Sequence, residues 1–128
     1  MVMDNENTVY NDMENDVDEM AVALQEAQDS ADTYTHVFKK PFVYMNKKYD
    51  ELHFDWGSLY GNDSLAIEAE LQALGVSVIV PTFSGPYLIR LAARACTERI
   101  GSDALGFMNI KDYNRIRSEA RSFLLASE

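Results

Sequence analysis

Two histidines and one cysteine are the side chains of this 128-residue chain best suited to metal binding or covalent catalysis. His36 and His53 have no cysteine partner and no carboxylate at a recognised metal-ligand spacing. Because His53 alternates with Leu52 and Phe54, we expect it to point to solvent from the polar face of a strand. Cys96 falls in an Ala- and Leu-rich helical segment, where a free cysteine commonly packs as a small buried hydrophobe. These residues predict neither a metal site nor a cysteine nucleophile.

The serine and glycine motifs are also better explained by structure than by catalysis. Ser84 lacks the Gly-x-Ser-x-Gly context of a nucleophilic serine, and its position before Gly85–Pro86 is typical of a helix start. The segment "GSLYG" has no phosphate-binding lysine, and neither a Gly-x-Gly-x-x-Gly nor a Walker motif occurs in the sequence. We therefore expect a non-enzymatic protein that binds no cofactor.

Four of the five lysines form two pairs, Lys39–Lys40 and Lys47–Lys48, around an aromatic-rich segment. The aromatic residues beside them are Phe42, Tyr44 and Tyr49. Lysines with aromatic rings can form a platform for single-stranded nucleic acid. Lysines on an edge hairpin also block edge-to-edge aggregation, and we favour this reading because the rest of the domain supplies no net positive field. Whether the three rings turn inward or leave an apolar strip for a partner stays open.

The formal net charge of -10 is concentrated at the N-terminus. Residues 1–33 contain ten acids and no Lys or Arg, whereas residues 34–128 contain eleven acids and eleven bases. We expect residues 1–33 to be a mostly disordered leader with one short helical segment at Asp18–Gln28, acting as a solubilising tail or as a tail that docks on a basic partner. A neutral domain behind an acidic leader argues against nucleic-acid binding.

The length of the chain indicates one domain, residues 34–128. The lack of targeting segments indicates a cytosolic protein. The sequence has no basic-then-apolar start typical of secretion and no apolar run near the length needed to span a bilayer. Cys96 is the only cysteine, so no intramolecular disulfide can form.

A hairpin is expected first, because period-two alternation follows the leader. Thr35 and Val37 share one face of a first strand, and Leu52 and Phe54 share one face of a second. The turn between them is predicted at Asn46–Lys47, since Asn tolerates a positive φ. Trp56, just past the second strand, is expected to anchor the hairpin on the helices.

Helical periodicity follows the hairpin. The apolar residues of a first helix are Ile67, Leu71 and Leu74. Asn62 or Asp63 can cap its start, and Gly75 can close it. The next segment, "VSVIV", fits either a buried strand or an extended connector.

Three further helical segments complete the prediction. A second helix is expected from Ser84 to Gly101, with the stripe Leu88, Leu91, Ala92 and Ala95. A short third helix opens at Ser102 or Asp103. Asn109 and Asp112 are predicted to cap the last helix reciprocally. Its expected apolar face is Tyr113, Ile116, Ala120, Phe123 and Leu124. The fold class is thus α+β, an N-terminal antiparallel β-hairpin followed by a bundle of three to four helices and preceded by a disordered acidic leader.

The order of these segments resembles the phage tail assembly chaperone family. The resemblance rests on a Lys-Pro strand, the hairpin "PFVYMNKKYDELHFD", the turn "SLYGNDSLAIEAEL", the helix "YLIRLAARA" and the closing "IKDYNRIRSEARSFLL". Asp63 and Asp112 match two aspartates of the family pattern, and Tyr60 stands where the turn often has threonine. The similarity covers residues 34–127 and leaves the leader unexplained.

The resemblance implies a non-enzymatic protein of the host bacterial cytoplasm that binds the tape-measure protein, helps to recruit tail-tube subunits and is absent from the mature virion. Such proteins often have a frameshifted longer form, of which this chain would be the short version, and self-association is a further expectation. Candidate partner-binding residues, on the hairpin edge and on the second and final helices, are Phe42, Tyr44, Tyr49, Leu88, Arg94 and Arg121. The alternatives are a minor tail component retained in the virion and a small nucleic-acid-binding regulator.

Overall fold

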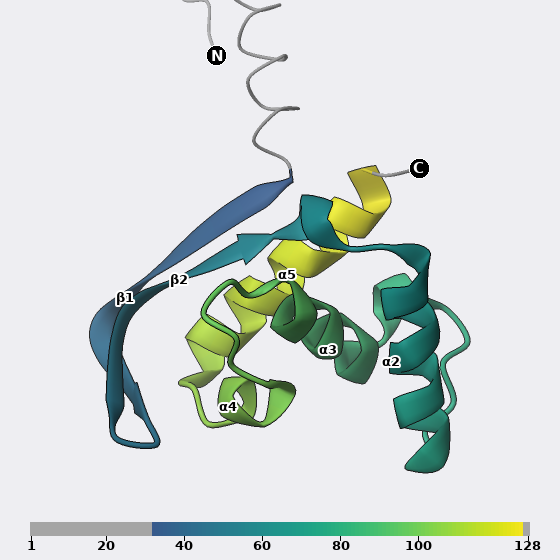
Figure 1. Ribbon diagram of the computed structural model, residues 1–128, viewed down its shortest axis with the longest axis horizontal. Coiled ribbons are helices and arrows are strands. Elements are labelled where there is room, and N and C mark those ends of the chain that lie inside the picture. The colour runs from purple at the N-terminus through teal and green to yellow at the C-terminus, as the bar shows by residue number, and fades with distance from the viewer. Residues whose placement is uncertain (1–31, 127–128) are drawn as a thin grey trace, which may run out of the picture. The chain divides into compact units, whose positions relative to one another are not determined.

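A computed structural model describes residues 32–126 of the chain. In this part, a two-stranded antiparallel hairpin precedes four helices, which confirms the predicted α+β class (Figure 1). The strands are β1 (Thr33–Tyr44) and β2 (Lys47–Asp55), and the helices are α2 (Gly61–Ala73), α3 (Gly85–Ala95), α4 (Ser102–Gly106) and α5 (Ile110–Ala126). Two 3-10 turns, η1 (Trp56–Ser58) and η2 (Pro81–Phe83), follow β2 and precede α3. The predictions made for the leader, including its helical segment, lie outside the described residues except at Asp32 and Thr33.

The hairpin turn lies at Met45–Asn46, one residue before its predicted position. Met45 and Asn46 have φ values of 51° and 65°, and Tyr44 pairs with Lys47 across the turn. A two-residue turn with positive φ at both positions matches the right-handed twist of the flanking strands. The pairing of the two strands therefore fixes the position of the turn, and Asn46 is the second of the two turn residues.

β1 contains a bulge that bends the hairpin (Figure 1). The residues from Phe38 to Pro41 lie opposite the single residue Asp50, because the register shifts between the pairs Val37–Glu51 and Phe42–Tyr49. Extra residues on one strand increase its local twist and bend it. Phe38 and Phe42, at the two sides of the bulge, are both buried, with ring centroids 5.6 Å apart. The bulge thus keeps both rings in the core while leaving Lys39 and Lys40 exposed.

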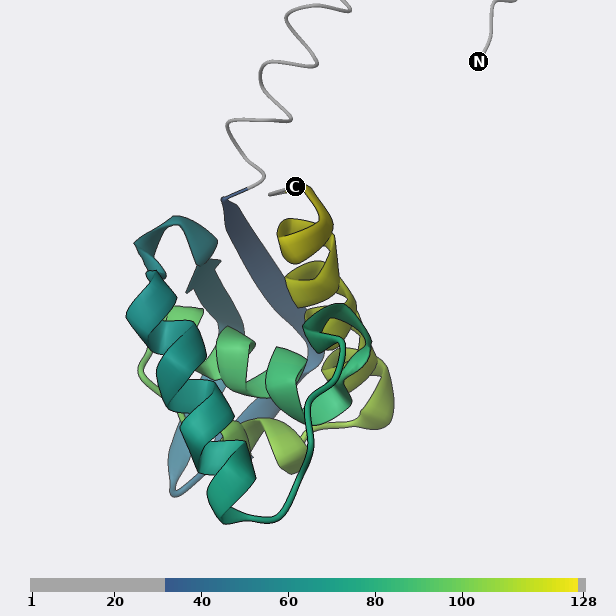
Figure 2. The same ribbon diagram turned by 90° about the vertical axis from the view of Figure 1, so that its right-hand side faces the viewer.

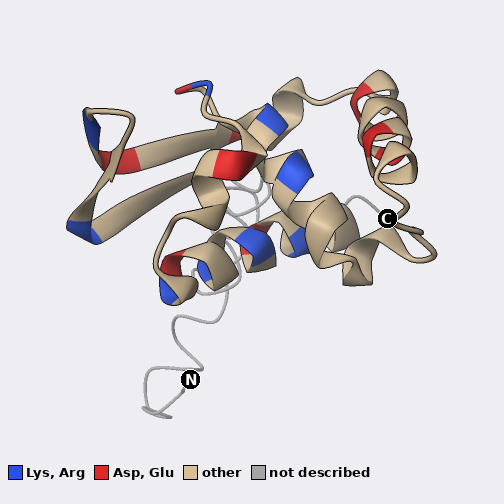
Figure 3. Cartoon of the chain, turned by 90° about the horizontal axis from the view of Figure 1, so that it is seen from below, with Lys and Arg blue, Asp and Glu red and all other residues tan. Residues whose placement is uncertain are grey.

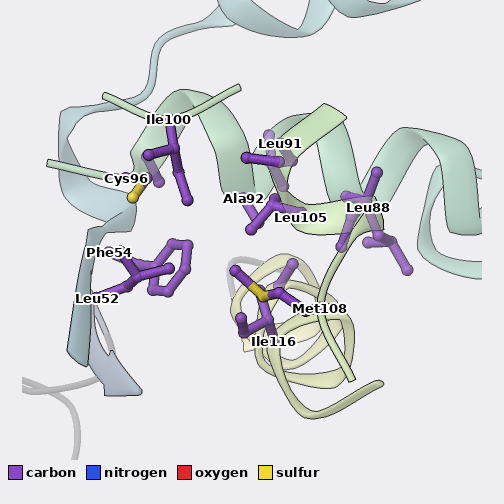
Figure 4. Close-up of a cluster of buried hydrophobic side chains, with 14 of the residues drawn as sticks. Leu52, Phe54, Leu88, Leu91, Ala92, Cys96, Ile100, Leu105, Met108 and Ile116 are labelled. Atoms are coloured by element: carbon purple, nitrogen blue, oxygen red, sulfur yellow. The ribbon is translucent and has the colours of Figure 1, made fainter. Parts of the chain in front are cut away.

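The helices lie against one face of the hairpin (Figure 2). Figure 4 shows Phe54 of β2, Leu91 of α3 and Ile116 of α5 meeting in one cluster of buried side chains. Trp56 is also buried and stacks on Phe54 and Phe123, with ring centroids 5.5 Å and 5.8 Å away. The expectation that Trp56 anchors the hairpin on the helices is confirmed.

α2 begins and ends through local hydrogen bonds. The carboxylate of Asp63 accepts the N–H of Tyr60 at 2.8 Å, so the predicted capping aspartate lies inside the first turn. Gly75, with φ of 79°, ends the helix as predicted, and the N–H of Val76 donates to the carbonyl of Leu71 at 2.8 Å. Leu74 was expected on the apolar face, but this was wrong: the chain leaves the helix there and the side chain is 65% exposed.

α3 starts as predicted but ends earlier. The hydroxyl of Ser84 accepts the N–H of Tyr87 at 3.2 Å, which confirms the cap. The helix stops at Ala95 instead of Gly101, because Cys96 adopts an extended conformation and forms a bridge with Phe54 of β2. Cys96 is buried as expected but lies just past the helix. Backbone pairing with β2 therefore replaces the last helical turns.

The start of α5 differs from the predicted reciprocal cap. The side chain of Asn109 accepts the N–H of Lys111 at 2.9 Å, as expected of a capping residue. The carboxylate of Asp112 instead accepts a hydrogen bond from the Nε2 atom of His36 of β1 at 2.8 Å. Ile116 and Ala120 of the predicted apolar face are buried. The remaining members of that face, Tyr113, Phe123 and Leu124, are half-buried against the core.

Candidate functional site

The three predicted aromatic partner-binding residues of the hairpin turn inward. The ring centroid of Phe42 lies 5.6 Å from that of Phe38, 6.1 Å from Tyr44 and 6.3 Å from Tyr49. Phe42 is buried, and Tyr44 and Tyr49 are half-buried against the core. Phe42 stacks on Tyr44, Tyr49 is tilted against Phe42, and all three rings pack against the core. They therefore leave neither an open apolar strip nor a platform on which several bases could stack.

The predicted helical residues do not gather into one surface either. Leu88 is 0% exposed and belongs to the core. Arg94 is paired with Asp63 at 2.8 Å and with Glu70 at 3.4 Å, so it links α3 to α2. The Nε group of Arg121 donates to the carbonyl of Thr82 at 2.8 Å, so it holds η2 against α5. These three residues stabilise the packing of the helices.

His36 is buried and joins the hairpin to α5. Its Nε2 atom lies 2.8 Å from the carboxylate of Asp112, and its Nδ1 atom lies 2.8 Å from the hydroxyl of Tyr34. Both ring nitrogens are thus hydrogen-bonded, as a buried imidazole requires. The family-like Asp112 therefore has a contact that spacing along the chain did not predict.

His53 lies at the surface between two acids. Its Nδ1 atom is 2.5 Å from Glu98 and its Nε2 atom is 2.8 Å from Glu51. The hydrogen bond to Glu98, followed by the charges of both acids, raises the pKa of His53 above its usual 6.5. The side chain is half-exposed on the polar side of β2, as predicted, but it is paired and not free in solvent.

Cys96 does not have the properties of a nucleophile. Burial raises the pKa of its thiol to about 11, although hydrogen bonds from the backbone act in the opposite direction. In the described part of the chain, no group of three His, Cys, Asp or Glu side chains could hold a metal ion. Cys96 therefore packs as a small apolar residue beside the bridge to Phe54.

An exposed apolar surface instead lies on residues 74–83, which we name the connector. The side chains of Leu74, Ile79 and Phe83 are 65%, 88% and 77% exposed. The segment "VSVIV" inside it forms no strand, so the structure decides in favour of a connector. Sequence reasoning missed this surface, because a short β-branched run is equally typical of a buried strand.

The backbone of the connector also has N–H groups that could donate hydrogen bonds to a partner. The N–H groups of Ser77, Val78 and Ile79 donate no hydrogen bond to any residue that the structure describes. Both ends of the connector are held, since Gly75 closes α2 and Arg121 binds the carbonyl of Thr82. Apolar side chains with unpaired backbone groups can be covered by a segment of a partner protein.

Within residues 32–126, no helix is long and apolar enough to cross a membrane. No protein-family model, no curated protein and no solved structure matches this chain. The function must therefore be argued from the residues and their arrangement.

Proposed function

We propose that this chain is a non-enzymatic phage tail assembly chaperone that holds an apolar segment of its client on the connector. The proposed clients are the tape-measure protein and the tail-tube protein, and the proposed place of action is the host bacterial cytoplasm. The single observation that carries the proposal is the exposure of Leu74, Ile79 and Phe83 on a segment with unpaired backbone groups. Exposed apolar side chains concentrated on one segment are typical of protein-interaction sites.

The connector provides an affinity suited to reversible holding. Full burial of a side chain of the size of Leu, Ile or Phe stabilises a complex by about 1.5–3 kcal/mol. Association and the ordering of side chains offset much of this gain, so a few such residues give moderate rather than permanent binding. A chaperone that must release its client needs such moderate affinity.

The connector is held at both ends, and this lowers the entropic cost of binding. α2 ends in the closed turn at Gly75, and η2 is held by Arg121. A segment whose ends are fixed loses less conformational freedom when a partner covers it. Arg121 thus supports the proposed site by positioning the connector, not by touching the client.

Co-expression with the phage tape-measure protein of the same genome tests the proposal. We expect the wild-type chain to increase the soluble fraction of that client and to co-elute with it on a sizing column. The double substitution Ile79→Ser and Phe83→Ser should remove both effects, because it removes the two most exposed large apolar side chains of the connector.

Leu65→Ser with Leu125→Ser is the matched control. These two leucines are also exposed but lie on α2 and α5, outside the connector. Loss of client binding in the control as well, or no complex with the wild-type chain, would contradict the proposal. Stoichiometric recovery of the chain from purified particles would favour a structural tail component instead.

A further inference from the structure

A groove separates the bulge of β1 from the start of α5. It has a volume of about 580 Å³ and is open to solvent on one side. One wall is the β1 segment from His36 to Val43. The other wall contains Phe107 at the end of α4 and Lys111, Asp112 and Arg115 of α5. None of these features belongs to the connector.

The groove carries positive charge that the described residues do not neutralise. Lys39, Lys40 and Lys111 line it, and none of them forms an ion pair with a described residue. Arg115 also lines it and is paired with Glu119 at 3.0 Å. The carboxylate of Asp112, the acid in the lining, is already bound by His36. The groove therefore fits a partner that brings its own negative charge.

α2 differs from the groove in the sign of its charge. Figure 3 shows both basic and acidic positions on the hairpin, whereas the charged positions on α2, at the opposite end, are all acidic. The acids of α2 are Asp63, Glu68 and Glu70, and two of them pair with arginines of α3. An acidic partner is thus attracted to the groove and repelled by the exposed acid of α2.

Apolar side chains line the groove together with the charged ones. The ring of Phe107 is 74% exposed and lies 5.8 Å from the ring of Tyr44. Val43 is exposed as well, and the buried rings of Phe38 and Phe42 complete the lining. An inorganic anion would leave these surfaces uncovered. A ligand that fills the groove must therefore combine acidic groups with an apolar anchor.

The two walls of the groove are fixed relative to each other. His36 of β1 and Asp112 of α5 are joined at 2.8 Å, and both residues line the groove. Because the walls are held before any ligand arrives, little conformational entropy is lost on binding.

We infer that this groove binds an acidic segment of a partner protein, with an apolar side chain of that segment seated between Phe107 and the bulge. The inference does not rest on the function proposed for the connector. Nucleic acid fits less well, because Phe42 packs against the rings of Tyr44 and Tyr49, and Phe107 alone offers an exposed ring in the groove. The acidic segment supplies carboxylates to Lys39, Lys40 and Lys111, and its apolar side chain covers Phe107.

Fluorescence anisotropy with a short labelled peptide of glutamates interrupted by leucines tests the inference on the full chain. We expect saturable binding that weakens with salt, since exposed charges are screened. Lys39→Glu with Lys40→Glu should weaken binding by about tenfold, because two attractions become repulsions at the rim. Phe107→Ser should weaken binding of this peptide but not of a matched peptide with serines in place of the leucines.

Lys47→Glu with Lys48→Glu is the matched control, since it makes the same charge change on the same hairpin outside the groove. It should leave most of the affinity intact. Equal loss in both lysine variants would overturn the inference, as would equal affinity for the leucine and serine peptides. Tighter binding of labelled oligothymidine than of the peptide would also overturn it and assign the groove to nucleic acid.

Discussion

At the scale of single residues, His53 shows how a surface imidazole becomes part of the fold. Glu98 lies just beyond the end of α3 and bonds both the backbone N–H and the ring of His53, while Glu51 approaches the other ring nitrogen from β2 itself. The charged form of His53 is therefore favoured in the folded chain. Glu98 also accepts a weak hydrogen bond from the thiol of Cys96 at 3.5 Å, so it fixes the turn that follows the β-bridge.

This arrangement predicts a pH-dependent contribution of His53 to stability. Its pKa is raised on folding, so the contribution is fully present below the ordinary value of 6.5 and is lost as the pH rises through the folded value. We expect the difference in unfolding free energy between the wild-type chain and His53→Gln to be larger at about pH 6 than at about pH 9. Urea unfolding at the two pH values measures it.

Glu98→Gln provides the control for this effect. An NMR titration of the His53 ring should give a pKa above 6.5 in the wild-type chain and a lower value in this variant, because the main cause of the shift is removed. A wild-type titration at or below 6.5 would show that the pair with Glu98 does not form in solution.

At the scale of elements, α3 is the centre of the helical layer. It packs on α2 and α5, and its buried residues include Leu88, Leu91, Ala92 and Ala95, the stripe that its periodicity predicts. The helix is amphipathic, and its arginines reach outward to the acids of α2. A partner cannot reach Leu88 without displacing this layer.

Leu88→Ala should therefore act on stability and not directly on binding. We expect it to lower the free energy of unfolding by about 2–5 kcal/mol, because it leaves a cavity at a fully buried position. Leu65→Ala on α2, where the leucine is exposed, should cost less than about 0.5 kcal/mol. Denaturant unfolding of both variants measures the difference, and equal small effects would place Leu88 at the surface.

At the scale of the molecule, the hairpin and α5 are joined through a buried polar contact. His36 and Asp112 are 76 residues apart in the sequence, and the two residues also fix the walls of the groove. Because His36 is buried, the loss of its partner would leave a ring nitrogen without a hydrogen bond. One pair thus supports both the fold and the site inferred in the groove.

Asp112→Ala should cost about 1–3 kcal/mol of unfolding free energy, the usual penalty for an unsatisfied buried polar group. In a His36→Phe background the same substitution should cost much less, because both polar partners are then absent. Asp50→Ala, which removes an exposed acid of the hairpin, is the control and should be nearly neutral. A large cost for Asp112→Ala in the His36→Phe background would refute the pairing as its cause.

The sequence by itself determined the elements and most of their inner faces. Alternation predicted the hairpin, helical spacing predicted the helices, and Ser84 and Gly75 predicted where α3 starts and α2 ends. These features depend on the conformational preferences of neighbouring residues, which the local sequence contains. The apolar residues of the connector were visible as residue types, but their exposure was not.

Only the tertiary structure decided how these elements meet. α3 stops at Ala95 because Cys96 pairs with Phe54. The aromatic residues of the hairpin turn inward because their rings pack against one another and against the core. The connector is exposed because no described strand pairs with it. Each outcome depends on contacts between residues far apart in the chain, and such contacts override local preference wherever backbone pairing or burial contributes more free energy.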